Sequence, residues 1–123
     1  MPGDVARNAP SIDTYGQGGF RLSGARHEGS VLIVGDLART WPVAAFEDLT
    51  VESLAPVFAL GSDGVEFVLL GMGAKLRPPP GALRVALAAA GIGLEAMDTA
   101  TAARMYNVLT SEGRRIAAAL IAI

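Results

Sequence analysis

The end of the chain, from Glu95 onward, is the feature that most constrains the fold. Asp98 or Thr99 can cap a helix with a side-chain oxygen, and Gly113 stands where a left-handed residue ends one. A helix is therefore expected from about Thr99 to Glu112. After it, Ile116 to Ile123 is apolar at every position, which is typical of a strand buried on both faces. A strand end, a capped helix and a buried strand in this order predict an α/β fold.

Strands and helices also alternate before this stretch. Val65 to Leu70 is apolar at five of six positions and predicts a central strand. Gly81 to Ala90 predicts a helix that Pro80 starts, and Gly93 to Met97 predicts a returning strand. Because the links are short, these segments should form right-handed crossover units.

The first half of the chain predicts antiparallel strands. Phe20 to Ser23, Ala25 to Glu28 and Ser30 to Val34 are separated by glycines and predict a β-meander. Thr50 precedes a short helix or 3₁₀ turn that contains Pro56, and the residues from 62 to 64 predict a turn.

We therefore expect a single three-layer α/β domain over residues 13–123, after a flexible lead-in over residues 1–12. The domain should have a mixed central sheet, crossover helices and the N-terminal β-meander. The apolar face of the last helix is expected at Ala102, Met105, Tyr106 and Leu109. Other positions expected in the core are Leu32, Val34, Trp41, Val68, Leu70, Leu94, Met97 and Leu120.

Composition excludes several classes of site. The 123 residues include no Cys, so disulfides, thiolate zinc sites and cysteine nucleophiles are excluded. His27 is the only histidine and has no second ligand nearby, so neither a metal nor another cofactor is expected. A net charge of −2 gives no basic field for nucleic acid. The longest apolar run is too short to span a bilayer, and no signal segment is visible, so a cytoplasmic protein is expected.

One candidate ligand site combines two segments. Gly71, Met72 and Gly73 follow one predicted strand, and Asp98 with Thr99 follows the next. Parallel strands would bring both segments to one sheet edge, forming a small polar crevice that binds an anion on free backbone N–H groups, with Lys75 assisting. The alternative is a plain turn, since neither a dinucleotide fingerprint nor a P-loop is present.

No set of residues shows a recognised catalytic spacing. Asp98, Tyr106, Glu112 and Lys75 are candidates for acid, base or nucleophile, but a cap, a core aromatic and a helix-end carboxylate explain the first three more simply. An enzyme stays open as the alternative, while a binding domain for a protein partner or a second copy is favoured. Its expected contact residues are Tyr106 and Asn107 on the last helix and Arg114 and Arg115 beyond it, although a solvated turn would also explain the arginines.

Several segments resemble one known family. They are Met97-Asp98-Thr99, Tyr106-Asn107-Val108-Leu109, Glu112-Gly113-Arg114-Arg115, the apolar tail and, earlier, Gly19-Phe20, Gly29-Ser30, Trp41, Gly71 and Gly73. From about Tyr15 to Ile123 the chain is similar to the small domains of unknown function that include mitochondrial complex I assembly factor 3 and the adipogenesis-associated Mth938-type proteins. The resemblance implies a three-layer α/β fold around a mixed sheet, and protein partners. Met72 departs from the family, which usually has Thr there.

Overall fold

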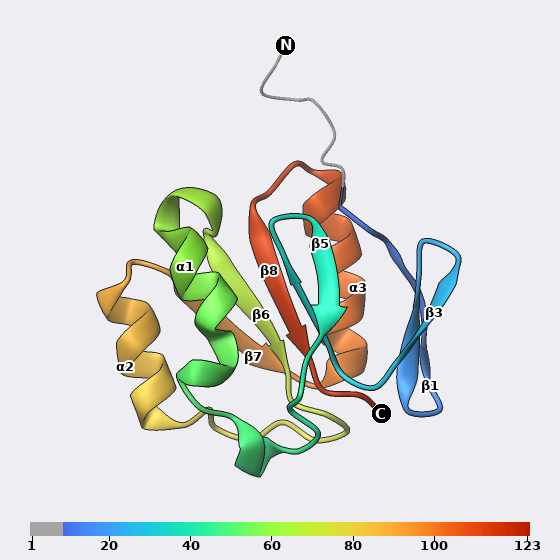
Figure 1. Ribbon diagram of the computed structural model, residues 1–123, viewed down its shortest axis with the longest axis horizontal. Coiled ribbons are helices and arrows are strands. Elements are labelled where there is room, and N and C mark those ends of the chain that lie inside the picture. Colours follow the sequence, from blue (N-terminus) through green and yellow to red (C-terminus); the bar gives the residue numbers. More distant parts are fainter. Residues whose placement is uncertain (1–8) are drawn as a thin grey trace.

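The computed structural model describes residues 9–123, which form two β-sheets and the helices around them (Figure 1). The first sheet contains β1 (Ile12–Gly16), β2 (Gly19–Leu22) and β3 (Ala25–Glu28). The second contains β4 (Val31–Val34), β5 (Leu37–Thr40), β6 (Phe67–Gly71), β7 (Gly93–Met97) and β8 (Ile116–Leu120). The helices are η2 (Phe46–Asp48), η3 (Glu52–Leu54), α1 (Ala55–Gly64), α2 (Gly81–Ala89) and α3 (Thr99–Ser111).

The central sheet is mixed, as predicted, and has the strand order β5-β4-β8-β6-β7. β6 lies between β8 and β7 and is parallel to both. β4 is antiparallel to β5 and β8. The last strand therefore runs in the same direction as β6 and β7, so the carboxyl ends of all three meet at one edge.

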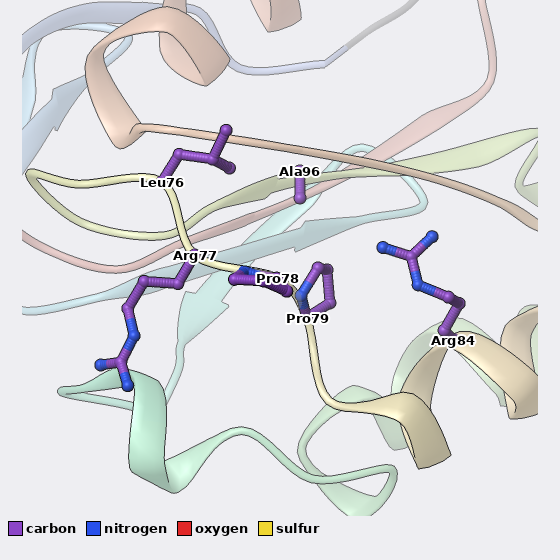
Figure 2. A pocket seen from close by; sticks show the side chains of 6 residues that line it. All are labelled: Leu76, Arg77, Pro78, Pro79, Arg84 and Ala96. Atoms are coloured by element: carbon purple, nitrogen blue, oxygen red, sulfur yellow. The ribbon is translucent and has the colours of Figure 1, made fainter.

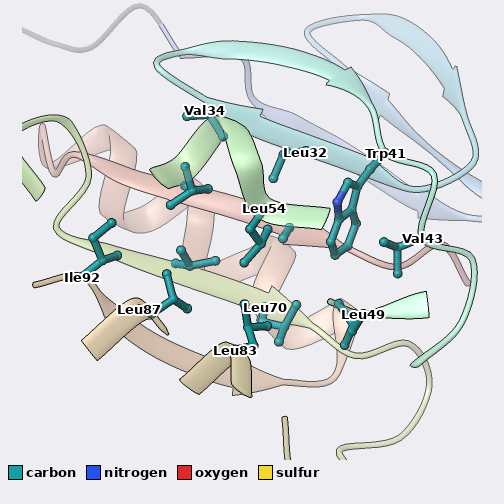
Figure 3. Packing of buried hydrophobic residues seen from close by; sticks show 14 of the residues in the cluster. Leu32, Val34, Trp41, Val43, Leu49, Leu54, Leu70, Leu83, Leu87 and Ile92 are labelled. Atoms are coloured by element: carbon teal, nitrogen blue, oxygen red, sulfur yellow. The ribbon is translucent and has the colours of Figure 1, made fainter. Parts of the chain in front are cut away.

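Helices cover both faces of this sheet, which gives the predicted three layers. Leu32, Val68 and Leu70 point to the face under α1 and α2, where Trp41 is 3% exposed and fills the core between elements (Figure 3). Val31, Ile33 and Leu69 point to the opposite face, under α3 and the small sheet. Because β6→β7 and β7→β8 move in opposite directions across the sheet, crossovers of one hand require α2 and α3 on opposite faces, as observed.

Three tight turns explain the strand pairing in the first half of the chain. Gln17-Gly18, Ser23-Gly24 and Gly35-Asp36 each join two antiparallel strands, and both residues of each pair have positive φ. Two-residue loops of this type match the twist of the flanking strands. The third loop creates β5, which was not predicted because its sequence, LART, has no apolar alternation.

The structure corrects four other expectations. The meander consists of β1, β2 and β3, whereas Val31–Val34 pairs with β5 and β8 in the central sheet. Ile12, assigned to the lead-in, begins β1 and is 4% exposed; residues 1–8 of that lead-in lie outside the described part. The turn expected at residues 62–64 belongs to α1, which continues past a kink at Gly61 (φ 74°). Met105 is exposed, since Ala103 takes its place on the buried face of α3.

Candidate functional site

Thr99 joins the carboxyl ends of the three parallel strands. Its side chain is fully buried at the first turn of α3. Its Oγ1 accepts a hydrogen bond from the Gly73 backbone N–H at 2.9 Å and donates to the Ile121 carbonyl at 2.7 Å. Its own backbone N–H donates to the Gly73 carbonyl at 2.9 Å. One hydroxyl therefore connects the segments that follow β6, β7 and β8.

Gly71 allows this close approach. A Cβ built there would lie 2.9 Å from Thr99 Oγ1, 3.0 Å from Thr99 Cα and 2.9 Å from Leu120 Cδ2. These separations are too short for any side chain without movement of α3. Met72 is 5% exposed, packs in the core, and donates its backbone N–H to the Met97 carbonyl at 2.8 Å. The glycine loop is thus built around packing against α3.

Asp98 caps α3. Its Oδ2 accepts from the Thr101 backbone N–H at 3.1 Å, and its Oδ1 accepts from the Thr101 hydroxyl at 2.7 Å. These bonds, the hydroxyl bond first, lower the pKa of Asp98 below its ordinary value because they stabilise the charged form. The carboxylate is therefore ionised at neutral pH and serves the helix terminus.

The structure brings the two predicted ligand-binding segments side by side but changes their expected chemistry. The N–H groups of Met72, Gly73 and Thr99 all donate within the protein, so the expectation that they are free is wrong. The short links after the strands bring these N–H groups close to acceptors of the protein itself, and buried backbone N–H groups are almost always hydrogen-bonded. Lys75 is exposed in the following loop. Anion binding at this edge stays a prediction.

Tyr106 and Asn107 hold the start of the described chain against α3. The Tyr106 hydroxyl donates to the Pro10 carbonyl at 2.9 Å, and Tyr106 is fully buried. Asn107 Oδ1 accepts from the Ile12 N–H at 2.9 Å, while its Nδ2 donates to the Ile12 carbonyl at 2.8 Å. The amide thus pairs with β1 much as a neighbouring strand would. Tyr106 has no surface for direct partner contact in the folded domain.

Arg114 and Arg115 lie elsewhere, at the amino end of β8. Arg114 Nε donates to Glu66 Oε1 at 3.1 Å, and the Arg115 backbone N–H donates to Glu66 Oε2 at 3.0 Å. The Arg115 backbone bond first, and then Arg114, lower the pKa of Glu66 below its ordinary value. The four predicted partner-binding residues therefore form two separate groups. Partner binding by Asn107, Arg114 and Arg115 stays a prediction.

Two surface features were not predicted from the sequence. On α3, Met105 (38% exposed) and Val108 (55% exposed) border a hollow of about 200 Å³ together with Arg104 and Leu109. Beside α2, a hollow of about 410 Å³ is lined by Leu76, Arg77, Pro78, Pro79, Arg84 and Ala96 (Figure 2). The sequence contained a sign of the hollow on α3, since Val108 is an apolar residue that lies off the apolar stripe of that helix. The sequence contained no sign of the hollow beside α2, because that hollow depends on how the loop with Pro78 and Pro79 crosses β7.

Residues 9–123 contain no group of three or more His, Cys, Asp or Glu side chains that could hold a metal ion. Among the helices of the same residues, none has the length and apolarity needed to cross a bilayer.

Comparison with known proteins places this geometry in a family. The chain is 47% identical over 110 residues to an uncharacterised protein of Rhodobacter capsulatus, covering 89% of this chain and 82% of that protein. It is 33% identical over 111 residues to NADH dehydrogenase (ubiquinone) 1 alpha subcomplex assembly factor 3 of Xenopus tropicalis, covering 89% of this chain but only 60% of the assembly factor.

Structural similarity agrees with the sequence comparison. The solution structure of a Bordetella pertussis protein described as an Mth938-like domain superimposes with a TM-score of 0.81 at 27% identity, covering 97% of this chain and 89% of that one. Residues 12–121 match the family described as "Protein of unknown function (DUF498/DUF598)". The resemblance seen in the sequence is confirmed, and the chain belongs to the DUF498/DUF598 family, with an Mth938-like fold.

Proposed function

We propose that this chain is a non-catalytic protein-binding domain with a role like that of an assembly factor, acting in the cytoplasm. The relatives named as assembly factors support this proposal, although the chain spans only about 60% of the Xenopus protein's length. The observation that carries it is the exposed apolar surface of α3, formed by Met105 and Val108 with the partly buried Leu109, around the hollow beside Arg104.

The structural roles of the catalytic candidates add support. Among the four candidates, Asp98 serves as a helix cap and Tyr106 holds Pro10. The polar groups of these two side chains are engaged in bonds that stabilise the fold. By contrast, the apolar side chains on α3 face solvent, where a protein partner would remove them from water and gain the free energy of that burial.

A capture experiment tests the proposal. Tagged wild-type chain should retain a specific partner from cells of the native source, and the Met105→Glu/Val108→Glu double variant should lose it. Val85→Glu is the control, because Val85 is 69% exposed on α2 and its substitution also places a carboxylate on an exposed helix, one instead of two, away from α3. Both substituted surfaces are exposed, so all variants should keep the wild-type melting temperature within a few degrees.

Two results would contradict the proposal. One is equal capture of the same partner by wild type and the α3 variant. The other is steady turnover by purified wild type in a hydrolase and transferase screen that disappears in Asp98→Ala. Recovery of the chain in the soluble cytoplasmic fraction of native cells tests the location.

An anion-binding role at the carboxyl edge of the sheet is the second candidate. The exposed Lys75 and the start of the 13-residue helix α3 favour it, whereas the ionised Asp98 beside them opposes it. Titration with inorganic phosphate, followed at the amides of residues 71–75, tests this candidate. Absence of any saturable change would remove it.

A further inference from the structure

β7 is an open edge of the central sheet. It pairs with β6 on one side, and no strand among the described residues pairs with its other side. The Gly93 N–H donates to Glu66 and the Met97 carbonyl accepts from Met72, so the odd-numbered positions direct their backbone groups toward β6. Since neighbouring residues alternate, Leu94 and Ala96 direct their N–H and C=O groups outward. Such groups form a template for another extended segment.

Cationic side chains border one face of this edge. The hollow of about 410 Å³ contains Ala96 of β7, and Figure 2 shows Ala96 between Leu76 and the guanidinium of Arg84. Arg77 also lines the hollow, but its guanidinium points away from Ala96 (Figure 2). Its Nη1 lies 3.2 Å from Glu47 Oε2, and its Cζ lies 3.9 Å from the centre of the Phe46 ring. The side chain of Arg84 makes no hydrogen bond or ion pair with any described residue. Among the described residues, none of those that line this hollow is acidic.

Apolar side chains border the other face. Asn107 holds β1 on one flank of α3. Met105 is two positions earlier, about 160° around the helix, and therefore lies on the flank of α3 away from β1. In Figure 1, β7 and β1 lie on opposite sides of α3. Met97 of β7 packs on the same face as Leu109. A segment added to β7 would thus meet arginine on one face, and apolar side chains beside the exposed Glu95 on the other.

We propose that the open edge of β7 binds an extended segment of a protein partner in which acidic and apolar residues alternate. The segment adds a sixth strand to the five-stranded sheet through the outward groups of Leu94 and Ala96. Its acidic side chains face Arg84, and its apolar side chains face Met105. This inference rests on the proposed function and specifies the chemistry of the partner.

Charge distinguishes this occupant from a second copy of the chain. Two β7 strands that overlap fully in antiparallel orientation would place Glu95 directly opposite its equivalent. Like charges at directly opposed positions destabilise a strand pair. An acidic and apolar segment instead places its carboxylates on the opposite sheet face from Glu95, since successive side chains of a strand alternate between faces.

The test is an NMR titration of the full ¹⁵N-labelled chain with a synthetic peptide that alternates valine and glutamate. Saturable shift changes and slowed amide exchange are expected at Leu94 and Ala96. A peptide with lysine in place of glutamate is the ligand control. Arg84→Glu should weaken binding about tenfold, and Ala96→Pro should abolish it, because proline removes an outward N–H that β6 does not use. Arg39→Glu, on the opposite edge strand β5, should bind like wild type.

Several outcomes would overturn the inference. They are no saturable change, changes centred on β5, equal binding of the lysine peptide, and equal binding by Arg84→Glu, whose substitution on an exposed helix position leaves the sheet untouched. A concentration-dependent dimer that Ala96→Pro abolishes would make a second copy the occupant. If the wild-type chain does not bind the peptide but still captures a native partner through α3, this inference fails while the proposed function stands.

Discussion

Replacing Thr99 by valine tests the connection between the three strand ends. Valine keeps the shape of the side chain but has no hydroxyl. The Gly73 N–H would lose its 2.9 Å acceptor, and the Ile121 carbonyl would lose its 2.7 Å donor. Both groups are bonded by a side chain that is fully buried, so water cannot replace it without local opening.

The expected cost follows from these two groups. Each unsatisfied buried group costs roughly 1–3 kcal/mol, and partial relaxation should limit the total to about 3 kcal/mol. For a domain of this size, each kcal/mol lowers the melting temperature by about 4 °C, so Thr99→Val should lower it by about 12 °C. Thr99→Ser keeps both bonds and loses one methyl group, which should cost only about 1 kcal/mol.

Thermal and urea unfolding, followed by circular dichroism, measure the effect. Thr14→Val is the matched control, because Thr14 is exposed on β1 and its substitution should change stability by less than about 0.5 kcal/mol. If Thr99→Val melts within about 2 °C of wild type, or if serine costs as much as valine, the hydroxyl does not stabilise the junction as argued.

Three further predictions concern neighbouring contacts. Gly71→Ala should destabilise the fold by about 1–3 kcal/mol, as overpacking does, measured by urea unfolding; no change would show that α3 can shift freely. Asp98→Ala should cost about 1 kcal/mol at neutral pH. Because the folded pKa of Asp98 is lowered, the difference in unfolding free energy between wild type and this variant should be complete above pH 3.8, the ordinary pKa, and should disappear as pH falls through the lower folded pKa. A difference in stability that persists in acid would refute the charged cap. Asn107→Leu should remove the hydrogen-exchange protection of the Ile12 amide, whereas retained protection would mean that another group holds β1.

The sequence was sufficient to predict the second half of the fold. From Val65 onward, apolar runs and glycine or proline boundaries mark each strand and helix, and short links determine the crossovers. The first half was harder because pairing there depends on turns. Leu37–Thr40 has no apolar pattern of its own and becomes β5 only because Gly35-Asp36 reverses the chain.

The candidate site was predictable in position but not in chemistry. The order of strands placed Gly71 and Thr99 at one edge, and the structure agrees. The hydrogen bonds of Thr99 to Gly73 and Ile121 could not be predicted, because they connect residues 22 and 26 positions away in the sequence. Met105 was assigned to the core because helical spacing alone does not distinguish it from Ala103, whose small side chain permits close packing of α3 on the sheet.

The affinity of the captured partner for the purified chain tests the protein-binding proposal most directly. Isothermal titration should show saturable binding to wild type and to Val85→Glu, and at least tenfold weaker binding to Met105→Glu/Val108→Glu. That loss is expected because each substitution would bury an unpaired charge in the contact. The same affinity for all three proteins would contradict the account of α3 as the contact surface.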